Sequence, residues 1–214
     1  MGILGGTGHE GRGLAARLAA HGVPVLLGSR SVERAREAVE RIAGGRSTVE
    51  AVANDDVVAR CDLVVLAVPF ATAPALLESY RERLRPGTVV VDLTVPLTFE
   101  GGSPDIVMPP EGSAAEHLRT LLPAEVGLAA TLKTIPAWIL GKTDEPLDCD
   151  EFVCADSPDA TRRVVEALAP IEGLRLIDAG GLDAARTLER MTLLAVGINR
   201  RYRVRTARFR VVGV

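Results

Sequence analysis

Gly5-Gly6-Thr7-Gly8-His9-Glu10-Gly11 is the stretch of sequence that decides the fold. It contains the pattern G-x-G-x-x-G as Gly6, Gly8 and Gly11, and it follows a short apolar segment at residues 2–4. Apolar residues at helical spacing follow it, between positions 10 and 21. A strand, a glycine loop and a helix in this order are typical of dinucleotide-binding proteins. A glycine-rich turn that binds nothing is the alternative interpretation.

Each glycine of the pattern has a physical role in such a loop. Gly6 permits the tight turn, Gly8 lets backbone N–H groups approach a pyrophosphate, and Gly11 lets the helix pack close to the strand. The helix N-terminus then presents partial positive charge to the anion. We therefore expect a group of loop residues to contact a dinucleotide: Gly6, Thr7, Gly8, His9, Glu10 and Gly11.

The rest of the chain alternates short apolar runs with amphipathic stretches, which is typical of an α/β fold. Further strands are predicted at residues 24–27, 47–51, 63–68, 88–93, 126–132, 152–155 and 174–178. Helices are predicted at 32–43, 72–84, 113–122, 158–168 and 183–198, with a short one capped by Asn54 or Asp55. We expect a Rossmann-type doubly wound parallel sheet with a small C-terminal α/β extension. Residues 1–141 would form the dinucleotide-binding domain and 142–214 a small domain that completes an acceptor pocket.

Composition excludes several classes of protein. The 214 residues include 25 basic and 28 acidic ones, a net charge of −3, so a dedicated nucleic-acid binder is not expected. No apolar run reaches the roughly 18–20 residues of a membrane span, and we see no secretion signal. The cysteines Cys61, Cys149 and Cys154 lack metal-ligand spacing, so we expect free thiols, no metal site and a cytoplasmic location.

The end of the second strand indicates which dinucleotide is bound. NAD sites usually carry an acidic residue there, whereas this chain has Ser29 and Arg30, with Arg34 one turn later. A hydroxyl and two guanidinium groups suit the 2′-phosphate of NADP. We therefore predict NADP(H), although any single arginine could instead be a solvated helix residue.

The end of the fourth strand provides further candidates. Val68, Pro69 and Phe70 follow an unbroken apolar run. Ligands of doubly wound sheets lie outside the carboxyl ends of strands, so these residues are expected beside the nicotinamide ribose. A strand that simply stops at a proline is compatible with the same sequence.

Three segments together resemble one known family. These are Gly5-Gly6-Thr7-Gly8, Gly28-Ser29-Arg30 and Thr134-Ile135-Pro136-Ala137, with Asp178-Ala179-Gly180 as a weaker match. They resemble the NADPH-dependent reductases of the deazaflavin coenzyme F420, and the resemblance extends to about residue 198. It implies direct hydride transfer between NADPH and coenzyme F420 in a homodimer, without a certain acid–base catalyst.

Residue roles follow from the same resemblance. It implies that Thr7, Ser29, Arg30 and Arg34 hold the NADP phosphates. It also implies a set of residues that form the walls around the two stacked rings: Val68, Pro69, Ile135, Pro136 and Ala137. Stacking at near-attack distance in a dry slot would supply most of the catalysis.

The sequence departs from the family pattern in two places. Lys133 stands where the family often has histidine, and it could pair with an anionic deazaflavin or a phosphate, or point to solvent. The segment from Arg200 to Arg210 is rich in arginine where the family often has glycine. It could attract the acidic tail of the deazaflavin, mark a different acidic acceptor, or form a charged edge strand. A reductase of another small acidic acceptor and a non-catalytic NADP-binding redox sensor therefore remain open.

Overall fold

An eight-stranded sheet forms the framework of the chain, in the order β10-β9-β8-β5-β4-β1-β2-β3. The structure is a computed structural model, and it describes residues 1–43, 48–99 and 102–214. The strands are β1 (Gly2–Leu4), β2 (Val25–Ser29), β3 (Val49–Ala53), β4 (Leu63–Leu66), β5 (Val89–Asp92), β8 (Gly127–Ala130), β9 (Cys149–Ala155) and β10 (Leu174–Gly180).

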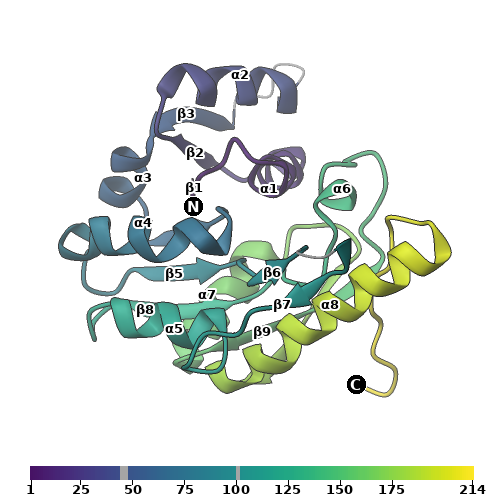
Figure 1. Cartoon of the computed structure of the whole chain (residues 1–214). Helices are drawn as coiled ribbons and strands as arrows, with labels where there is room; N and C mark the ends of the chain where they lie inside the picture. The colour runs from purple at the N-terminus through teal and green to yellow at the C-terminus, as the bar shows by residue number, and fades with distance from the viewer. Residues whose placement is uncertain (44–47, 100–101) are drawn as a thin grey trace.

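Helices cover both faces of this sheet, as a doubly wound fold requires (Figure 1). One face carries α1 (His9–Ala20), α2 (Val32–Ala43), α6 (Ala137–Leu140) and α7 (Pro158–Leu168). The other carries α3 (Asn54–Arg60), α4 (Ala73–Tyr80), α5 (Ala114–Leu121) and α8 (Ala185–Tyr202). The predicted fold class is confirmed. No helix in the described ranges combines the length and the apolar character of a membrane span.

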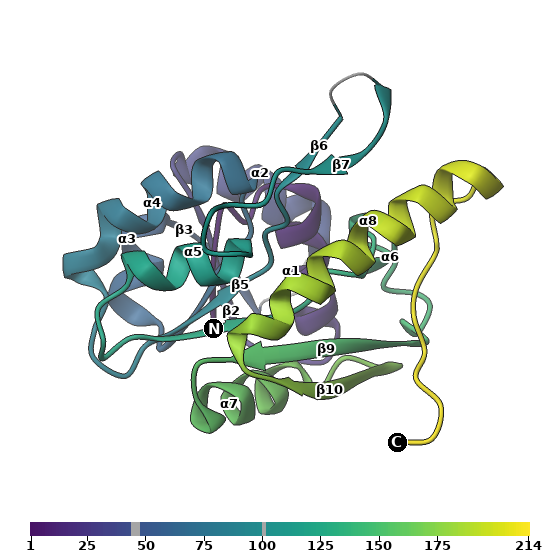
Figure 2. The same cartoon turned by 60° about the horizontal axis from the view of Figure 1, so that its bottom comes forward.

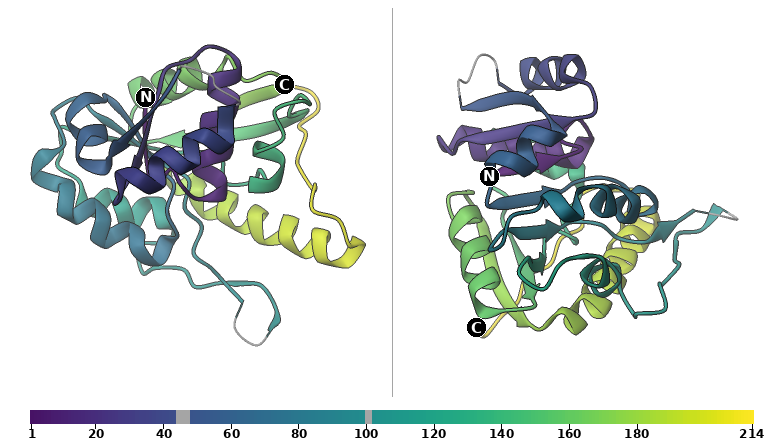
Figure 3. Two further views of the ribbon diagram at one scale, coloured as in Figure 1. Left: turned by 90° about the horizontal axis from the view of Figure 1, so that it is seen from above. Right: turned by 90° about the vertical axis from the view of Figure 1, so that its left-hand side faces the viewer.

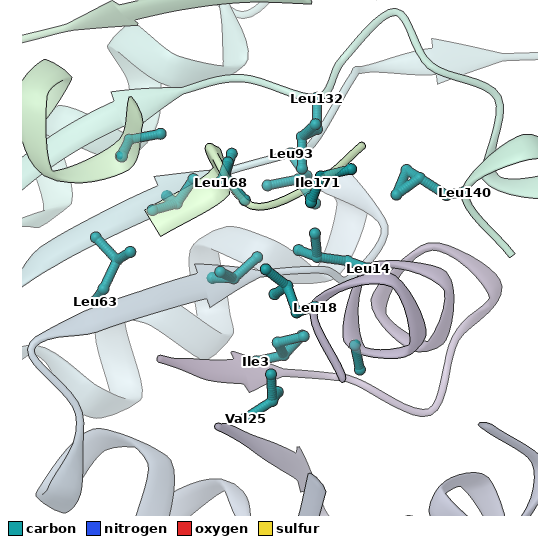
Figure 4. Packing of buried hydrophobic residues seen from close by; sticks show 14 of the residues in the cluster. Ile3, Leu14, Leu18, Val25, Leu63, Leu93, Leu132, Leu140, Leu168 and Ile171 are labelled. Atoms are coloured by element: carbon teal, nitrogen blue, oxygen red, sulfur yellow. The ribbon is translucent and has the colours of Figure 1, made fainter. Parts of the chain in front are cut away.

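The central strands are almost entirely apolar, as expected for strands that are buried on both sides, and the main exception is Asp92 at the end of β5. Successive side chains point to opposite faces, so Ile3 packs into the cluster under α1 while Leu4 packs into the cluster under α3 and α4. Figure 4 shows Ile3 beside Leu14 and Leu18 of α1 and Val25 of β2. This packing fixes α1, and with it the glycine loop, against the carboxyl end of β1.

The last two strands depart from the expected parallel arrangement. β9 pairs antiparallel with β8, with Ala129 opposite Ala155, and β10 then pairs parallel with β9. Residues 131–148 contain only the four-residue helix α6, so no full helical crossover returns the chain for a parallel pair. Both strands continue the same sheet, and a domain boundary at residue 141 stays a prediction.

Local details also differ from the predictions. No strand was predicted between residues 94 and 112, but β6 (Leu97–Thr98) and β7 (Asp105–Ile106) pair as a short antiparallel hairpin that projects from the sheet (Figures 2 and 3). Asn54 and Asp55 do not cap α3, because Ala53 is the N-cap and no side chain accepts a cap bond. Helix α5, in contrast, has a side-chain cap, since Ser113 accepts from the Glu116 amide at 3.0 Å. Ser47, the start of the third predicted strand, lies outside the described residues.

Arg17 joins α1 to the segment that contains α6. Its side chain is buried, and its guanidinium donates to the carbonyl oxygens of Leu140 at 3.1 Å, Ile139 at 2.8 Å and Glu145 at 2.8 Å. A further bond goes to the carbonyl of Lys142. These carbonyls belong to the end of α6 and the turn after it, where helical N–H donors run out, although the Ile139 carbonyl also accepts from the Lys142 amide at 3.1 Å. One side chain therefore positions the residues that follow Ile135–Ala137.

We predict that Arg17→Ala lowers the free energy of unfolding by about 2–4 kcal/mol, because it leaves several carbonyls without donors. Denaturant unfolding followed by circular dichroism measures this. Arg41→Ala is the control: Arg41 on α2 is exposed and makes only a 4.0 Å contact with Glu37. The free energy of unfolding of the Arg41→Ala variant should differ from that of the unmodified chain by no more than about 0.5 kcal/mol. Equal effects of the two substitutions would contradict the assigned role of Arg17.

Candidate active site

The glycine loop lies between β1 and α1 and is held tightly by its neighbours. The Gly6 amide donates to the Gly28 carbonyl at 2.9 Å. A Cβ on Gly6 would lie 2.7 Å from Leu27, and one on Gly11 would lie 2.8 Å from the Gly6 Cα. These two positions therefore require glycine for close packing of α1 against the strands, as the sequence pattern predicts.

Gly8 differs from the other two glycines because it faces open space. It is exposed, and the nearest atom to a Cβ built on it is the Gly5 carbonyl oxygen at 3.6 Å. Gly8 is also the N-cap of α1, and no side chain caps the first amides of this helix. Open amides at a helix N-terminus bind phosphate groups well. The loop thus fits the pyrophosphate of a dinucleotide.

The carboxyl end of β2 lies next to this loop through the Gly6–Gly28 bond. Ser29 is buried and its hydroxyl accepts from the Ser31 amide at 3.3 Å. Arg30 and Arg34 are exposed, and neither guanidinium forms an ion pair with any residue in the described part of the chain. Two unengaged guanidinium groups beside a hydroxyl fit a 2′-phosphate.

A cavity of about 440 Å³ opens at the carboxyl ends of the central strands. Three predicted groups of residues meet in its wall: Gly8, His9 and Glu10; Val68, Pro69 and Phe70; Ile135, Pro136 and Ala137. The remaining predicted residues lie outside this wall, in the loop or at the end of β2: Gly6, Thr7, Gly11, Ser29, Arg30 and Arg34. The structure therefore places three of the predicted segments around one cavity.

Several lining residues were not predicted from the sequence. They are Ala67, Leu93, Thr94, Val95, Leu97 and Thr192. Lys133, for which the sequence left ligand pairing and solvent exposure both open, also lines the cavity. Leu97 comes from the β6–β7 hairpin and Thr192 from α8, so both elements border the cavity. The Thr192 hydroxyl donates to the Lys133 carbonyl at 2.8 Å. Only the position of residues 93–97 after a buried strand could have indicated some of them.

Lys133 is completely buried, so the expectation that it might point to solvent is wrong. Its ammonium lies 2.7 Å from an Asp92 carboxylate oxygen and 3.4 Å from a Glu189 oxygen, and it donates to the Thr94 carbonyl. Burial alone would lower the pKa of Lys133, but attraction by Asp92 and Glu189 outweighs it and raises the pKa above its ordinary value. The lysine is therefore a charged bridge between the ends of β5 and β8 and helix α8.

Two further carboxyl groups are buried around this lysine. Burial raises the pKa of Glu151 to about 7, although bonds from the Thr134 hydroxyl at 2.8 Å and amide at 3.1 Å oppose the rise. Burial also raises the pKa of Glu189, whose carboxylate accepts from the Ala114 amide at the start of α5. These contacts tie residues 133–134 to β9 and α8, directly before the segment Ile135–Ala137.

The C-terminal arginines surround a neighbouring hollow of about 330 Å³. Pro136 and Trp138 line it together with Arg200 and Arg205. Trp138 is exposed, with the Lys142 ammonium 5.5 Å from its ring centre, so it is not a core residue. A charged edge strand is not formed here, because the segment makes only one isolated antiparallel bridge with the sheet.

That bridge joins Phe209 to Asp150 of β9. Beside it, Arg208 donates to the Leu147 carbonyl at 2.6 Å and Arg210 pairs with Asp148. The last arginines therefore hold the terminus against β9, whereas Arg200 and Arg205 face the hollow beside Pro136.

Comparison with known proteins places the chain among relatives. A family model described as "NADP oxidoreductase coenzyme F420-dependent" matches residues 1–96. An F420-dependent NADP reductase of Methanothermobacter thermautotrophicus is 37% identical, with 99% of this chain and 94% of that protein aligned. One of Methanocaldococcus jannaschii is 32% identical over 99% of this chain and 97% of the relative.

A solved structure leads to the same family. A protein from Arthrobacter sp. FB24, assigned as an F420-dependent NADP reductase, superimposes with a TM-score of 0.84 at 25% identity. The match covers 99% of this chain and 98% of that one, so it includes the C-terminal strands and α8. With relatives above 30% identity aligned over almost its whole length, the chain belongs to the family of F420-dependent NADP reductases.

Proposed function

We propose that this chain transfers a hydride directly between NADP(H) and the deazaflavin coenzyme F420. The observation that carries the proposal is the cavity that joins the glycine loop to Val68–Phe70 and Ile135–Ala137. The named relatives are F420-dependent NADP reductases, which supports the identity of both substrates. A single cavity bordered by the glycine loop suits the nicotinamide and deazaflavin rings, which must stack face to face for hydride transfer.

The binding roles follow from the positions of the residues. Open amides of the glycine loop, with Thr7 beside them, would hold the pyrophosphate, and Ser29, Arg30 and Arg34 would hold the 2′-phosphate. His9 is exposed at the mouth of the loop, where its ring nitrogen lies 3.4 Å from an Arg12 nitrogen. This anchoring fixes the nucleotide so that its ring enters the cavity.

The walls would perform most of the catalysis. Val68, Pro69, Ile135, Pro136 and Ala137 present apolar surfaces to the cavity. Such walls exclude water and hold two rings at reacting distance, which replaces a bimolecular encounter by an intramolecular one. Arg200 and Arg205, beside Pro136, would attract the acidic tail of the deazaflavin.

The cavity also separates this proposal from a redox sensor. A protein that binds NADP only to change partners needs the phosphate loop but no slot for a second ring. The hollow is lined by Ile135 and Pro136 as well as by the glycine loop, which favours a reductase over a sensor. A reductase of another acidic acceptor would use the same slot, so the acceptor itself must be tested.

Stopped-flow absorbance tests the acceptor. Mixing NADPH with oxidised coenzyme F420 and the purified chain should bleach the deazaflavin band together with the NADPH band, in equal amounts. The same mixture without enzyme is the control. Tight NADPH binding with no change in either band would contradict the proposed acceptor.

The NADP preference is tested with Arg30→Ala combined with Arg34→Ala. Loss of two charged hydrogen-bonding groups should raise the KM for NADPH about 30–100-fold, from about 2–3 kcal/mol of lost binding. The KM for NADH, which lacks the 2′-phosphate, should hardly change. Arg36→Ala on the same exposed helix is the matched control. An equal rise in the KM values for NADPH and NADH would show that the two arginines do not recognise the 2′-phosphate.

We further propose that the chain is a cytoplasmic homodimer. Exposed apolar side chains on the β6–β7 hairpin segment and on α8 support a partner surface, with Phe99 60%, Val107 67% and Leu194 55% exposed. Light scattering after gel filtration should give twice the mass of one chain, and Leu194→Glu should shift the equilibrium toward monomer. A monomer at micromolar concentration would contradict the dimer.

A further inference from the structure

Glu10 lies in the wall of the cavity, and its carboxyl group has no chemical role in the function proposed above. It lies in the first turn of α1, and it shares the cavity with Val68–Phe70 and Ile135–Ala137. Its side chain is half-buried, and within the described ranges its carboxyl forms neither a hydrogen bond nor an ion pair. An unpartnered carboxyl is thus available to whatever fills the cavity.

The charged groups around Glu10 come from three other elements. Lys133 follows β8, Asp92 ends β5 and Glu151 lies on β9. The Lys133 ammonium is already engaged by Asp92, Thr94 and Glu189. Near Glu10 on its own helix, His9 and Arg12 contact each other.

The carboxyl groups therefore outnumber the one buried ammonium. Burial raises the pKa of Glu10 to about 8; Lys133 opposes the rise, and Glu151 and Asp92 add to it. At neutral pH this carboxyl is mostly a neutral acid.

Hydride transfer in such a cavity creates opposite charges on two rings. It leaves a positive charge on the nicotinamide and brings a negative charge to the acceptor ring. Uncompensated charge in an apolar space is costly. A nearby neutral acid compensates both charges. Its proton neutralises the negative acceptor ring, and the carboxylate that remains balances the positive nicotinamide.

We propose that Glu10 is a catalytic residue that donates the proton accompanying the hydride. A C–H bond of the dihydronicotinamide breaks and a C–H bond of the deazaflavin forms, while the Glu10 O–H bond breaks and an N–H bond forms on the deazaflavin ring. Glu10 remains as a carboxylate beside the oxidised nicotinamide and regains a proton from water when the products leave. In the reverse direction it accepts the proton. This inference rests on the proposed function.

Nucleotide binding without acceptor tests the charge pairing. As Glu10 ionises through about pH 8, the affinity for NADP⁺ should rise about tenfold relative to NADPH, because only NADP⁺ carries the ring charge. Glu10→Gln should abolish this rise, whereas Glu10→Asp, which keeps an acid, should retain part of it. Glu37→Gln on exposed α2 is the control. A rise that persists in Glu10→Gln would overturn the proposal.

The unliganded protein gives a second readout. A carboxyl whose pKa is raised on folding contributes stability that is fully present below its unfolded value and is lost as pH rises through about 8. The Tm of Glu10→Gln should therefore fall less between pH 5 and pH 9 than that of the unmodified chain. A cooperative thermal transition in the same experiment also shows that the Glu10→Gln variant is folded. Parallel pH profiles for the two proteins would contradict a buried neutral Glu10.

Stopped-flow reduction of coenzyme F420 completes the test. The unmodified chain should slow as pH rises through about 8, and Glu10→Gln should be about 100-fold slower, with only the pH dependence of the free acceptor left. An unchanged rate and pH profile in Glu10→Gln would overturn proton donation but leave the reductase assignment intact. No reduction by the unmodified chain would overturn both.

Discussion

The ammonium of Lys133 links three elements beside the cavity: the end of β5, the end of β8 and helix α8. It contacts Asp92 at the end of β5 and Glu189 on α8, and it follows the end of β8. A buried charge is stable only if its partners are all in place, since loss of one leaves an uncompensated ion. The position of Ile135, two residues later, is thus determined by the same contacts that hold α8 over the sheet.

This constraint also explains the electrostatics of the cavity. Glu10, Asp92, Glu151 and Glu189 converge on one lysine. Four ionised carboxyl groups beside one cation would be unfavourable in the interior. Burial disfavours the charged form and raises the pKa values of Glu10, Glu151 and Glu189. Glu151 and Glu189 are compensated by backbone amides, whereas Glu10 faces the hollow. Among these four carboxyl groups, Glu10 is the one that lines the cavity and forms no hydrogen bond or ion pair with the described residues.

Much of the fold could be predicted because local patterns and long-range packing agree. The apolar run at residues 63–66 is buried on both sides, and Gly11 is required where α1 meets the loop. The direction of β9 could not be predicted, because strand patterning carries no information on pairing. The cap of α3 was wrong because Asn54 lies inside the helix rather than before it.

Parts of the candidate site were predictable where a residue type has one physical use. The loop glycines belong to that class, because Gly6 and Gly11 are packed too closely for a side chain, whereas the binding role of the arginines after β2 stays a prediction. The environment of Lys133 was not predictable. Its partners Asp92 and Glu189 lie far from it in the sequence, and the three residues meet only in the folded chain. Thr192 was missed for the same reason, since a threonine in an amphipathic helix gives no signal of the cavity that it borders.

Isotope transfer tests the central claim most directly. NADPH carrying deuterium at the transferred position of its ring is reacted with coenzyme F420 on the enzyme in ordinary water, and the reduced deazaflavin is analysed by mass spectrometry and NMR. Direct ring-to-ring transfer in a closed cavity predicts that the deuterium is found on the carbon of the reduced deazaflavin without loss to solvent. Appearance of the label in water would show that the two rings do not meet in this cavity.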